Sequence, residues 1–224
     1  MKEHPLLCND AAVRGILAGA KITTWRPVRG PGRGRRYYWT DLIQDTDIGD
    51  DGRKISLGFE DAYGDWHKTE SVCPYGQPGD RLYVREAWRV HTWDENSGMI
   101  QVEYRDGSIS DSLDCPDEEM FERLWIQSSD DAQKKAVKYN EDGQYCWGIG
   151  EAPTRWRPNI HMPKWAARTW LEIATLDVRL VAETTPAEAV ADGFETVAGF
   201  MEFWRETYGV APWAWKIGIR RVAC

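Results

Sequence analysis

The sequence lacks the features of a membrane-spanning or secreted protein. It contains no run of about 18 apolar residues, and its first ten residues, MKEHPLLCND, have no basic segment followed by an apolar one. Its five cysteines are widely spaced and form no C-x-x-C pair, which argues against a disulfide framework or a ribbon-type zinc site. We therefore expect a cytoplasmic protein with reduced thiols and no membrane association.

Histidine is scarce, and no internal repeat is visible. The four histidines have no ligand spacing such as H-x-x-x-H, so no metal site is predicted, and nothing in the sequence requires a cofactor. They are His4, His67, His91 and His161.

Aromatic residues, in contrast, are abundant. The 224 residues include 13 Trp, 9 Tyr and 5 Phe, and 42% of them are hydrophobic while 29% are charged. A chain of this composition can bury a core, which excludes intrinsic disorder. Its length corresponds to one large domain or two small ones.

The net charge of −8 is unevenly distributed along the chain. Residues 1–40 carry eight basic groups and two acidic ones, whereas residues 41–150 carry 11 basic and 25 acidic groups. An acidic protein is a poor non-specific binder of duplex nucleic acid, because neutralised phosphates supply most of that affinity. The Gly/Arg segment Arg29–Arg36 is either a solvated loop or a patch that attracts one anionic ligand.

The first regular elements are a helix and a strand. Asn9 or Asp10 can cap a short helix that ends before Gly19, a residue suited to the left-handed conformation. The β-branched residues within 22–26 favour a strand, which Pro27 ends.

Glu86 belongs to a predicted strand, Arg81–Trp88, that follows a turn over Tyr75–Asp80. On that strand its carboxylate shares a face with Leu82 and Val84. Such a group is either paired with a cation or has a raised pKa, and both conditions are frequent at functional sites. In the alternative, the strand ends before Glu86 and leaves it solvated.

The middle of the chain is expected to hold little regular structure. A short helix over Asp117–Ile126 is predicted inside acidic and polar loop. The proline-broken segment Arg155–Trp165 interleaves cations with tryptophans, as stacking on a base and contact with a phosphate require. The same tryptophans can instead attach a long loop to the core.

The last third of the chain has strong signals. We expect a strand over Trp170–Val181, a capping box at Thr185–Glu188 that opens a short helix, a second helix over Val197–Tyr208, and a final strand over 213–219. Asp192 falls in the last turn of the short helix, where the dipole disfavours an anion, so it has another role or is exposed. The order of elements predicts an α+β fold, a small mixed or antiparallel barrel with helices packed at its ends.

The segment Gly19–Arg26 resembles the opening signature of the ASCH domains, G-x-K-x-x-T-x-R, through four matching residues: Gly19, Lys21, Thr24 and Arg26. Later pieces agree in order: Pro78–Leu82 resembles the family's Pro-Gly-Asp turn, Thr185–Gly193 its short helix and Ala214–Val222 its closing strand. The longer stretches Cys73–Trp88 and Trp156–Trp165 are similar to a phage- and prophage-encoded branch.

The resemblance implies one PUA-like domain over residues 1–224, with loop-rich insertions at 29–72 and 90–154. This fold holds RNA or modified nucleosides, and the location it implies is the cytoplasm of a bacterial host. One small group of the family is an amidohydrolase that deacetylates N4-acetylcytidine with a Lys, a Thr and a Glu. The Lys and Thr correspond to Lys21 and Thr24, whereas the Glu corresponds to Asp192, one methylene shorter. Glu86 is the candidate replacement.

Amide hydrolysis needs a nucleophile, a base, an oxyanion donor and an acid for the leaving amine. On these chemical grounds Thr24 can act as the nucleophile, a neutral, desolvated Lys21 as its base, and Asp192 or Glu86 as the carboxyl that handles the leaving-group proton. The predicted substrate-binding residues are Arg26, Trp25, Arg85, Trp156, Arg157 and Trp165. The alternatives are a non-catalytic module that binds RNA or single-stranded nucleic acid, and a ribonuclease.

Overall fold

The structure, a computed structural model, describes two compact units of the chain. The described residues are 1–28, 46–48, 54–60, 66–138, 141, 145–209 and 213–223, with the backbone alone described for 46–48, 54–60 and 66–71. Unit 1 comprises Met1–His4, Gly15–Leu82 and Trp170–Ala223; unit 2 comprises Pro5–Arg14 and Tyr83–Thr169. The Gly/Arg segment Arg29–Arg36 lies outside the described residues. The predicted insertion at 90–154 falls inside unit 2.

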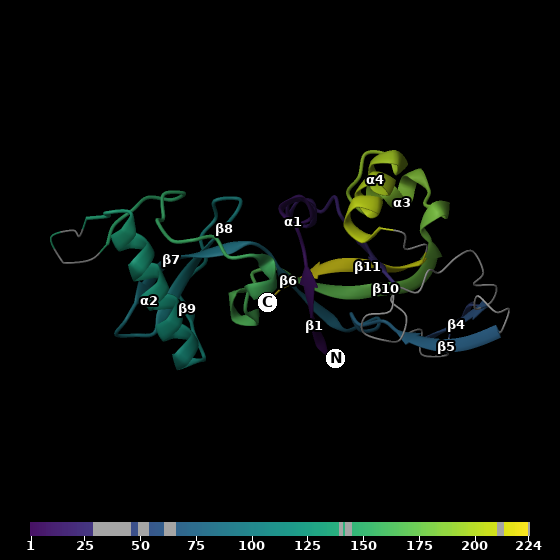
Figure 1. Cartoon of the computed structure of the whole chain (residues 1–224), viewed down its shortest axis with the longest axis horizontal. Helices are drawn as coiled ribbons and strands as arrows, with labels where there is room; N and C mark the ends of the chain where they lie inside the picture. The colour runs from purple at the N-terminus through teal and green to yellow at the C-terminus, as the bar shows by residue number, and fades with distance from the viewer. Residues whose placement is uncertain are drawn as a thin grey trace. The chain divides into compact units, whose positions relative to one another are not determined.

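The helices and strands follow one another as an α+β chain (Figure 1). They are β1 (Glu3–Leu7), α1 (Asp10–Leu17), β2 (Thr23–Pro27), β3 (Thr46–Ile48), β4 (Lys54–Glu60), β5 (Trp66–Val72), β6 (Arg81–Arg85), β7 (Trp88–Asp94), β8 (Met99–Tyr104), β9 (Leu113–Asp114), α2 (Glu118–Lys134), β10 (Trp170–Leu180), α3 (Pro186–Ala191), α4 (Val197–Tyr208) and β11 (Trp213–Val222). Short 3₁₀ turns occupy Asn159–His161, Lys164–Ala166 and Val181–Glu183.

The strands form three sheets. One sheet has the order β1-β6-β10-β11-β2, and the other two have the orders β3-β4-β5 and β7-β8-β9. β10 pairs antiparallel with β11, and β11 pairs antiparallel with β2, which is an edge strand. The α+β class is confirmed. Over the residues that the structure describes, the sheets are open and none closes into a barrel.

The predicted N-terminal helix and strand are confirmed as α1 and β2. The side chain of Asn9 caps α1 by accepting the backbone N–H of Ala12 at 2.8 Å. Gly19 follows the helix with a φ of 72°, a conformation that side chains other than glycine rarely adopt. This turn brings the chain from α1 to Lys21, two residues before the first residue of β2.

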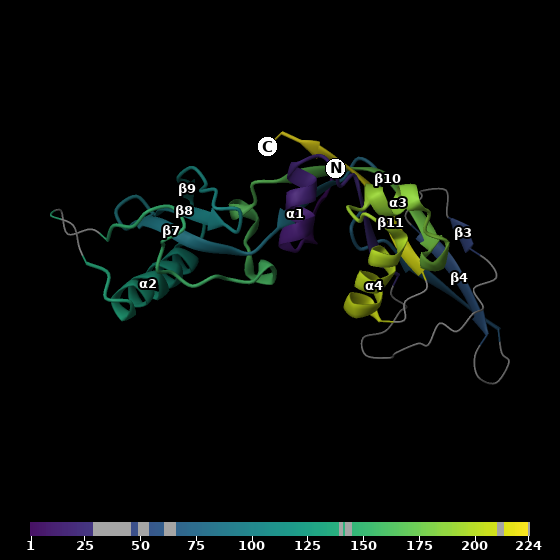
Figure 2. The ribbon, with the colours of Figure 1, turned by 90° about the horizontal axis from the view of Figure 1, so that it is seen from above.

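Helices α3 and α4 have the predicted ends and cover one face of β2 and β11. The capping box at Thr185 is present, with its side chain accepting the Glu188 N–H, and α4 ends at Gly209. In the core beneath them, Trp25 meets Phe200 edge-on, with ring centroids 5.4 Å apart. Figures 1 and 2 both show the two helices beside β10 and β11.

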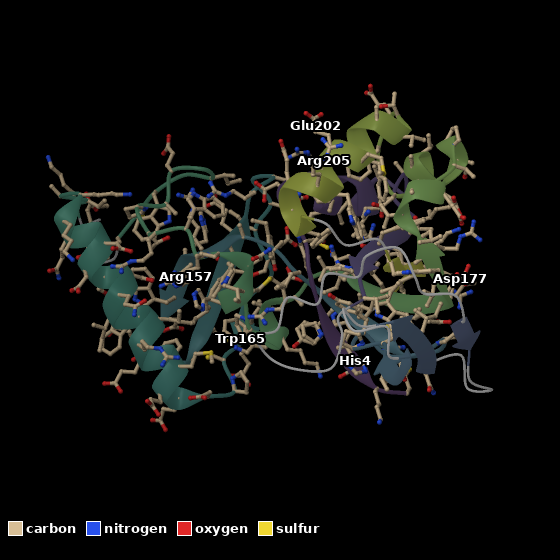
Figure 3. The ribbon with its side chains drawn as sticks, turned by 45° about the vertical axis from the view of Figure 1, so that its right-hand side comes forward. His4, Arg157, Trp165, Asp177, Glu202 and Arg205 are labelled. Atoms are coloured by element: carbon tan, nitrogen blue, oxygen red, sulfur yellow. The ribbon has the colours of Figure 1, made fainter. Side chains whose placement is uncertain are left out.

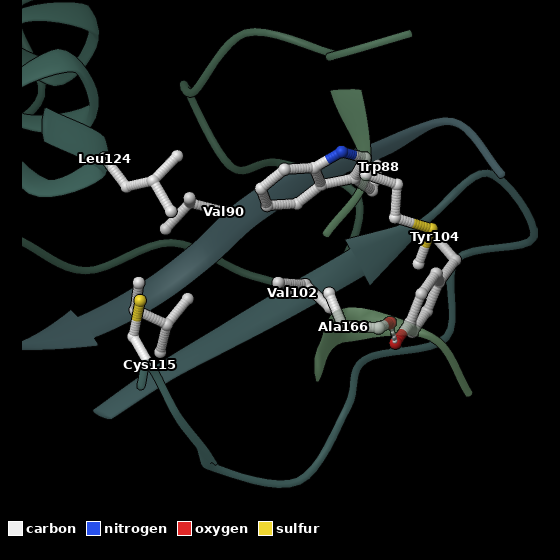
Figure 4. Packing of buried hydrophobic residues seen from close by; sticks show 9 residues of the cluster. Trp88, Val90, Val102, Tyr104, Cys115, Leu124 and Ala166 are labelled. Carbon is white, nitrogen blue, oxygen red and sulfur yellow. Dashed lines mark hydrogen bonds between the residues drawn. The ribbon is translucent and has the colours of Figure 1, made fainter. Parts of the chain in front are cut away.

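The prediction of acidic loop over most of residues 89–155 is wrong. Strands β7, β8 and β9 form a sheet there, and the predicted helix extends to Lys134, eight residues beyond Ile126. Helix α2 packs Leu124 against this sheet, and Tyr104 donates a hydrogen bond to the Ala166 carbonyl oxygen at 2.9 Å (Figure 4). The N-terminal strand β1 was not predicted either.

The predicted strand Arg81–Trp88 is two strands. β6 ends at Arg85 and β7 begins at Trp88 in another sheet, so Glu86 and Ala87 lie between two strands. The strand therefore does end before Glu86, but the expected consequence of that alternative, a solvated carboxylate, is wrong because Glu86 is only 3% exposed.

Four of the cysteines, Cys8, Cys73, Cys115 and Cys146, are thiols rather than disulfides, as predicted. Cys224 lies outside the described residues. Within the described ranges, no helix has the length and apolar character needed to cross a membrane.

Candidate functional site

Lys21 and Asp192 form a buried ion pair in unit 1. The ammonium group of Lys21 donates to the carboxylate Oδ1 of Asp192 and, at 2.6 Å, to its backbone carbonyl oxygen. Lys21 is 7% exposed and Asp192 is 6% exposed. The stem of Lys21 lies against Gly15 of α1 and Gly193 after α3, where a Cβ atom would come within 3.1 and 3.7 Å of the Lys21 Cβ. The two glycines therefore leave room for the lysine stem.

Asp192 stands at the C-terminal end of α3, where the helix dipole disfavours an anion, and the contacts of its carboxylate account for this placement. Its carboxylate accepts the backbone N–H of Trp25 on the edge strand β2, as well as the Lys21 ammonium. Burial raises the pKa of Asp192 to about 6, although Lys21 and Arg26 oppose that shift. Asp192 is therefore a buried carboxylate with a raised pKa and a cationic partner, rather than an exposed helix end.

Thr24 and Arg26 lie on one face of β2, and Trp25 lies on the other. Thr24 is buried opposite Ile217 of β11, whereas Trp25 is opposite Lys216 and faces α3 and α4. Arg26 donates to the hydroxyl oxygen of Tyr208 at 2.8 Å, and its charge acts on Asp192. The site thus contains two cations and one carboxylate.

Trp25 is a core residue. It is buried, and its indole Nε1 has no hydrogen-bond partner among the described residues. The ammonium of Lys216 lies 6.0 Å from the centre of its ring and donates to Glu188 at 2.7 Å. Trp25 therefore supports the site through packing and through its backbone N–H.

Glu86 belongs to unit 2 and is paired with an arginine there. Arg168 donates to both of its carboxylate oxygens, at 2.9 and 2.8 Å, and also contacts Asp106 at 2.9 Å. Burial raises the pKa of Glu86 despite the contact with Arg168, and the charge of Asp106 adds to that rise. Both conditions expected from the sequence, a paired carboxylate and a raised pKa, are present together.

The remaining predicted binding residues also lie in unit 2. Arg85 donates to the Ile160 carbonyl oxygen. The guanidinium groups of Arg89 and Arg105 lie over the Trp156 ring, with their carbons 4.7 and 4.0 Å from the ring centroid. Trp165 packs edge-on against Trp88, with centroids 6.3 Å apart. The tryptophans of Arg155–Trp165 are thus engaged in contacts within unit 2.

A buried polar cluster in unit 2 was not predicted. Glu103 of β8 accepts hydrogen bonds from Arg89 at 3.1 and 2.7 Å and lies 3.2 Å from the Nδ1 of His91. All three side chains are buried. The period-two alternation of Ile100, Val102 and Tyr104 was the signal for β8, and the strand pairing with β7 would have placed Arg89 opposite Glu103.

In the described part of the chain, no group of three or more His, Cys, Asp or Glu side chains is arranged to hold a metal ion. Comparisons with protein-family models, with curated proteins and with solved structures found no match to this chain.

Proposed function

We propose that the protein is a hydrolase that removes an acyl group from the exocyclic amine of a modified nucleoside or base, on a PUA-like domain of the ASCH type. The observation that carries the proposal is the contact between Lys21 and Asp192. The shorter aspartate reaches the lysine, so the proposal does not need Glu86, whose carboxylate is held by Arg168. The pattern Gly19–Arg26 supports the choice of substrate class.

The proposed reaction begins with a proton transfer. Because burial raises the pKa of Asp192 to about 6, its carboxylate accepts a proton from Lys21 more readily than an exposed carboxylate does, and the transfer leaves a neutral amine. The amine then takes the Thr24 hydroxyl proton as the oxygen attacks the acyl carbon. Arg26, oriented by Tyr208, stabilises the oxyanion that forms.

The tetrahedral intermediate then collapses to an acyl ester, which water hydrolyses. The bond from carbon to the exocyclic nitrogen breaks as that nitrogen receives a proton from Lys21, which leaves an acyl ester on Thr24. Water attacks the ester and gives a proton to Lys21. The threonine oxygen recovers that proton as the carboxylic acid leaves.

The test is turnover of a panel of acylated and otherwise modified nucleosides, N4-acetylcytidine included, followed by mass spectrometry. The variants are Thr24→Val and Thr24→Ser, with Thr23→Val as the matched control. Thr23 is the neighbour of Thr24 on the same strand, and its hydroxyl has no partner within the described residues. We expect the wild type and Thr23→Val to release free nucleoside and Thr24→Val to lose at least 10²-fold in rate, while Thr24→Ser retains part of it.

Equal rates for Thr24→Val and Thr23→Val would refute the nucleophile assignment. Absence of turnover by the wild type across the panel would refute the hydrolase and favour the alternative, a module that binds RNA or single-stranded nucleic acid. Salt-titrated binding then tests that alternative, because contacts with several phosphates weaken steeply as salt rises.

A further inference from the structure

Gly15 lies inside helix α1, where glycine is an unfavourable residue. It is the sixth of the eight residues Asp10–Leu17. Glycine loses more conformational entropy on folding than alanine does, so it destabilises a helix interior. The φ of Gly15 is not in the left-handed region, unlike that of Gly19, so the backbone does not need a glycine here. The reason for a glycine therefore lies in the space that a side chain would fill.

That space is occupied by Lys21. A Cβ atom at Gly15 would lie 3.1 Å from the Lys21 Cβ, 3.9 Å from its backbone nitrogen and 4.0 Å from its Cδ. The first distance is shorter than the separation of roughly 3.5–4.0 Å at which two carbon atoms pack. At Gly193 the same atom would lie 3.7 Å from the Lys21 Cβ, an ordinary contact. Gly15 is thus the tighter of the two glycines beside the lysine stem.

The backbone of Lys21 cannot move away from Gly15 without breaking hydrogen bonds. The Gly15 carbonyl oxygen accepts the N–H of Lys21 at 3.0 Å and that of Ala20 at 2.9 Å. The next residue, Ile22, donates its N–H to the Ala191 carbonyl oxygen at 2.9 Å. A methyl group on Gly15 would therefore displace the stem of Lys21 rather than its backbone.

The end of that stem is the ammonium group that contacts Asp192. It donates to the carboxylate Oδ1 and, at 2.6 Å, to the backbone carbonyl oxygen. We propose that Gly15 is a positioning residue of the proposed hydrolase, because its lack of a side chain lets the Lys21 ammonium reach Asp192. The inference rests on the proposed function for its effect on turnover, but not for its effect on the ion pair.

The first test follows the ion pair itself. The carboxyl carbon of Asp192 is titrated by NMR, with Asp192→Asn for its assignment, in the wild type, in Gly15→Ala and in Lys21→Met, which lacks the ammonium. Burial raises the pKa of Asp192, and the charges of Lys21 and Arg26 oppose that rise. We therefore expect the midpoint to move to higher pH in both variants. Gly15→Ala should add no further shift to Lys21→Met, because the ammonium is already absent.

Gly199→Ala is the matched control, since it makes the same change in another helix. Gly199 lies in α4, the helix that carries Glu202 and Arg205, both labelled in Figure 3. A Cβ atom there would lie 3.4 Å from the Thr196 Oγ1, an ordinary contact. We expect this variant to titrate like the wild type. An Asp192 midpoint in Gly15→Ala equal to that of the wild type would overturn the proposal.

The second test is turnover of the nucleoside panel. Because the misplaced amine acts in the chemical step, Gly15→Ala should lower kcat by about 10-fold and leave KM unchanged, while Gly199→Ala keeps the wild-type values. An unchanged kcat in Gly15→Ala would overturn the role in catalysis. Absence of turnover by the wild type would refute the hydrolase, whereas a shifted Asp192 titration would still establish that Gly15 positions the lysine.

A third measurement uses the wild type alone, and it decides the contact if Gly15→Ala does not fold. We expect a nuclear Overhauser effect between the Hα protons of Gly15 and the Hβ protons of Lys21, because the two residues are in close contact. Its absence would overturn the proposal.

Discussion

Lys21 donates hydrogen bonds to both the carboxylate and the backbone carbonyl of Asp192, across a sequence separation of 171 residues. Lys21 lies just before β2 and Asp192 is the C-cap of α3, and the backbone N–H of Trp25 also donates to the carboxylate. The pair therefore joins the end of the short helix to the segment before the edge strand and places two buried charges in unit 1.

The first prediction concerns the pH dependence of stability. The pKa of Asp192 is higher in the folded protein, about 6, than its ordinary value of 3.8, so folding strengthens proton binding. The resulting stabilisation is complete below pH 4 and is lost as the pH rises through 6, by roughly 3 kcal/mol. Urea unfolding between pH 4 and 7 should show that fall in the wild type and a smaller one in Asp192→Asn. Identical slopes for the two proteins would contradict the assignment.

The second prediction concerns the buried pair of Arg89 and Glu103 in unit 2. Glu103→Gln leaves the guanidinium of Arg89 buried without a charge partner, which should lower the free energy of unfolding by about 3 to 5 kcal/mol. Glu172→Gln is the control, because its pair with Arg220 is largely exposed and should contribute about 1 kcal/mol or less. Denaturant unfolding measures both, and similar losses would argue against this ranking.

A third prediction compares two buried threonines. The Thr23 hydroxyl has no partner among described residues, whereas the Thr154 hydroxyl donates to the Val90 carbonyl oxygen. Thr23→Val should leave the protein as stable as the wild type or more so, while Thr154→Val should cost about 1 to 3 kcal/mol because it leaves a buried carbonyl unpaired. Thermal and urea unfolding of the two variants would reveal the difference, and a loss in Thr23→Val would show that its hydroxyl has a partner.

The fourth prediction concerns the capping box of α3. Thr185→Ala removes the acceptor of the Glu188 N–H and should destabilise the protein by about 1 kcal/mol. Thr185→Ser retains a hydroxyl acceptor and should restore most of the loss. Comparison of their unfolding midpoints checks this, and equal midpoints for Ala and Ser would show that the cap contributes little.

Local signals predicted the parts of the fold that depend on local chemistry. The caps of α1, α3 and α4 and the strands β2, β10 and β11 were predictable because turn glycines, a capping box and alternating apolar residues act over a few positions. The sheet β7-β8-β9 was missed because acidic residues in 89–155 obscured its alternation. The break at Glu86 was missed because Leu82, Val84 and Trp88 fit one strand face equally well.

The candidate site residues were also predicted only in part, because their tertiary partners are distant in the sequence. The resemblance placed Lys21, Thr24 and Asp192 in one constellation, and the structure brings Lys21 and Asp192 into contact. A cationic partner for Glu86 was one of the two expected conditions, but Arg168 itself was not predicted, since no local pattern identifies a partner 82 residues away. The aromatic loop Arg155–Trp165 was expected to offer stacking surfaces, but its tryptophans are used in packing. Tertiary neighbours decide such roles, and the sequence pattern does not contain them.

The division of the chain between its two units sets an order of assembly during synthesis. Unit 2 ends at Thr169 among the described residues, so the ribosome has produced all of that part before β10 begins. Unit 1 needs Trp170–Ala223, which contains α3, α4 and β11. Because domains can fold as they emerge, unit 2 can acquire its structure while unit 1 is still incomplete. Lys21 is made 171 residues before Asp192, so its ammonium group has no access to that carboxylate until α3 has been synthesised.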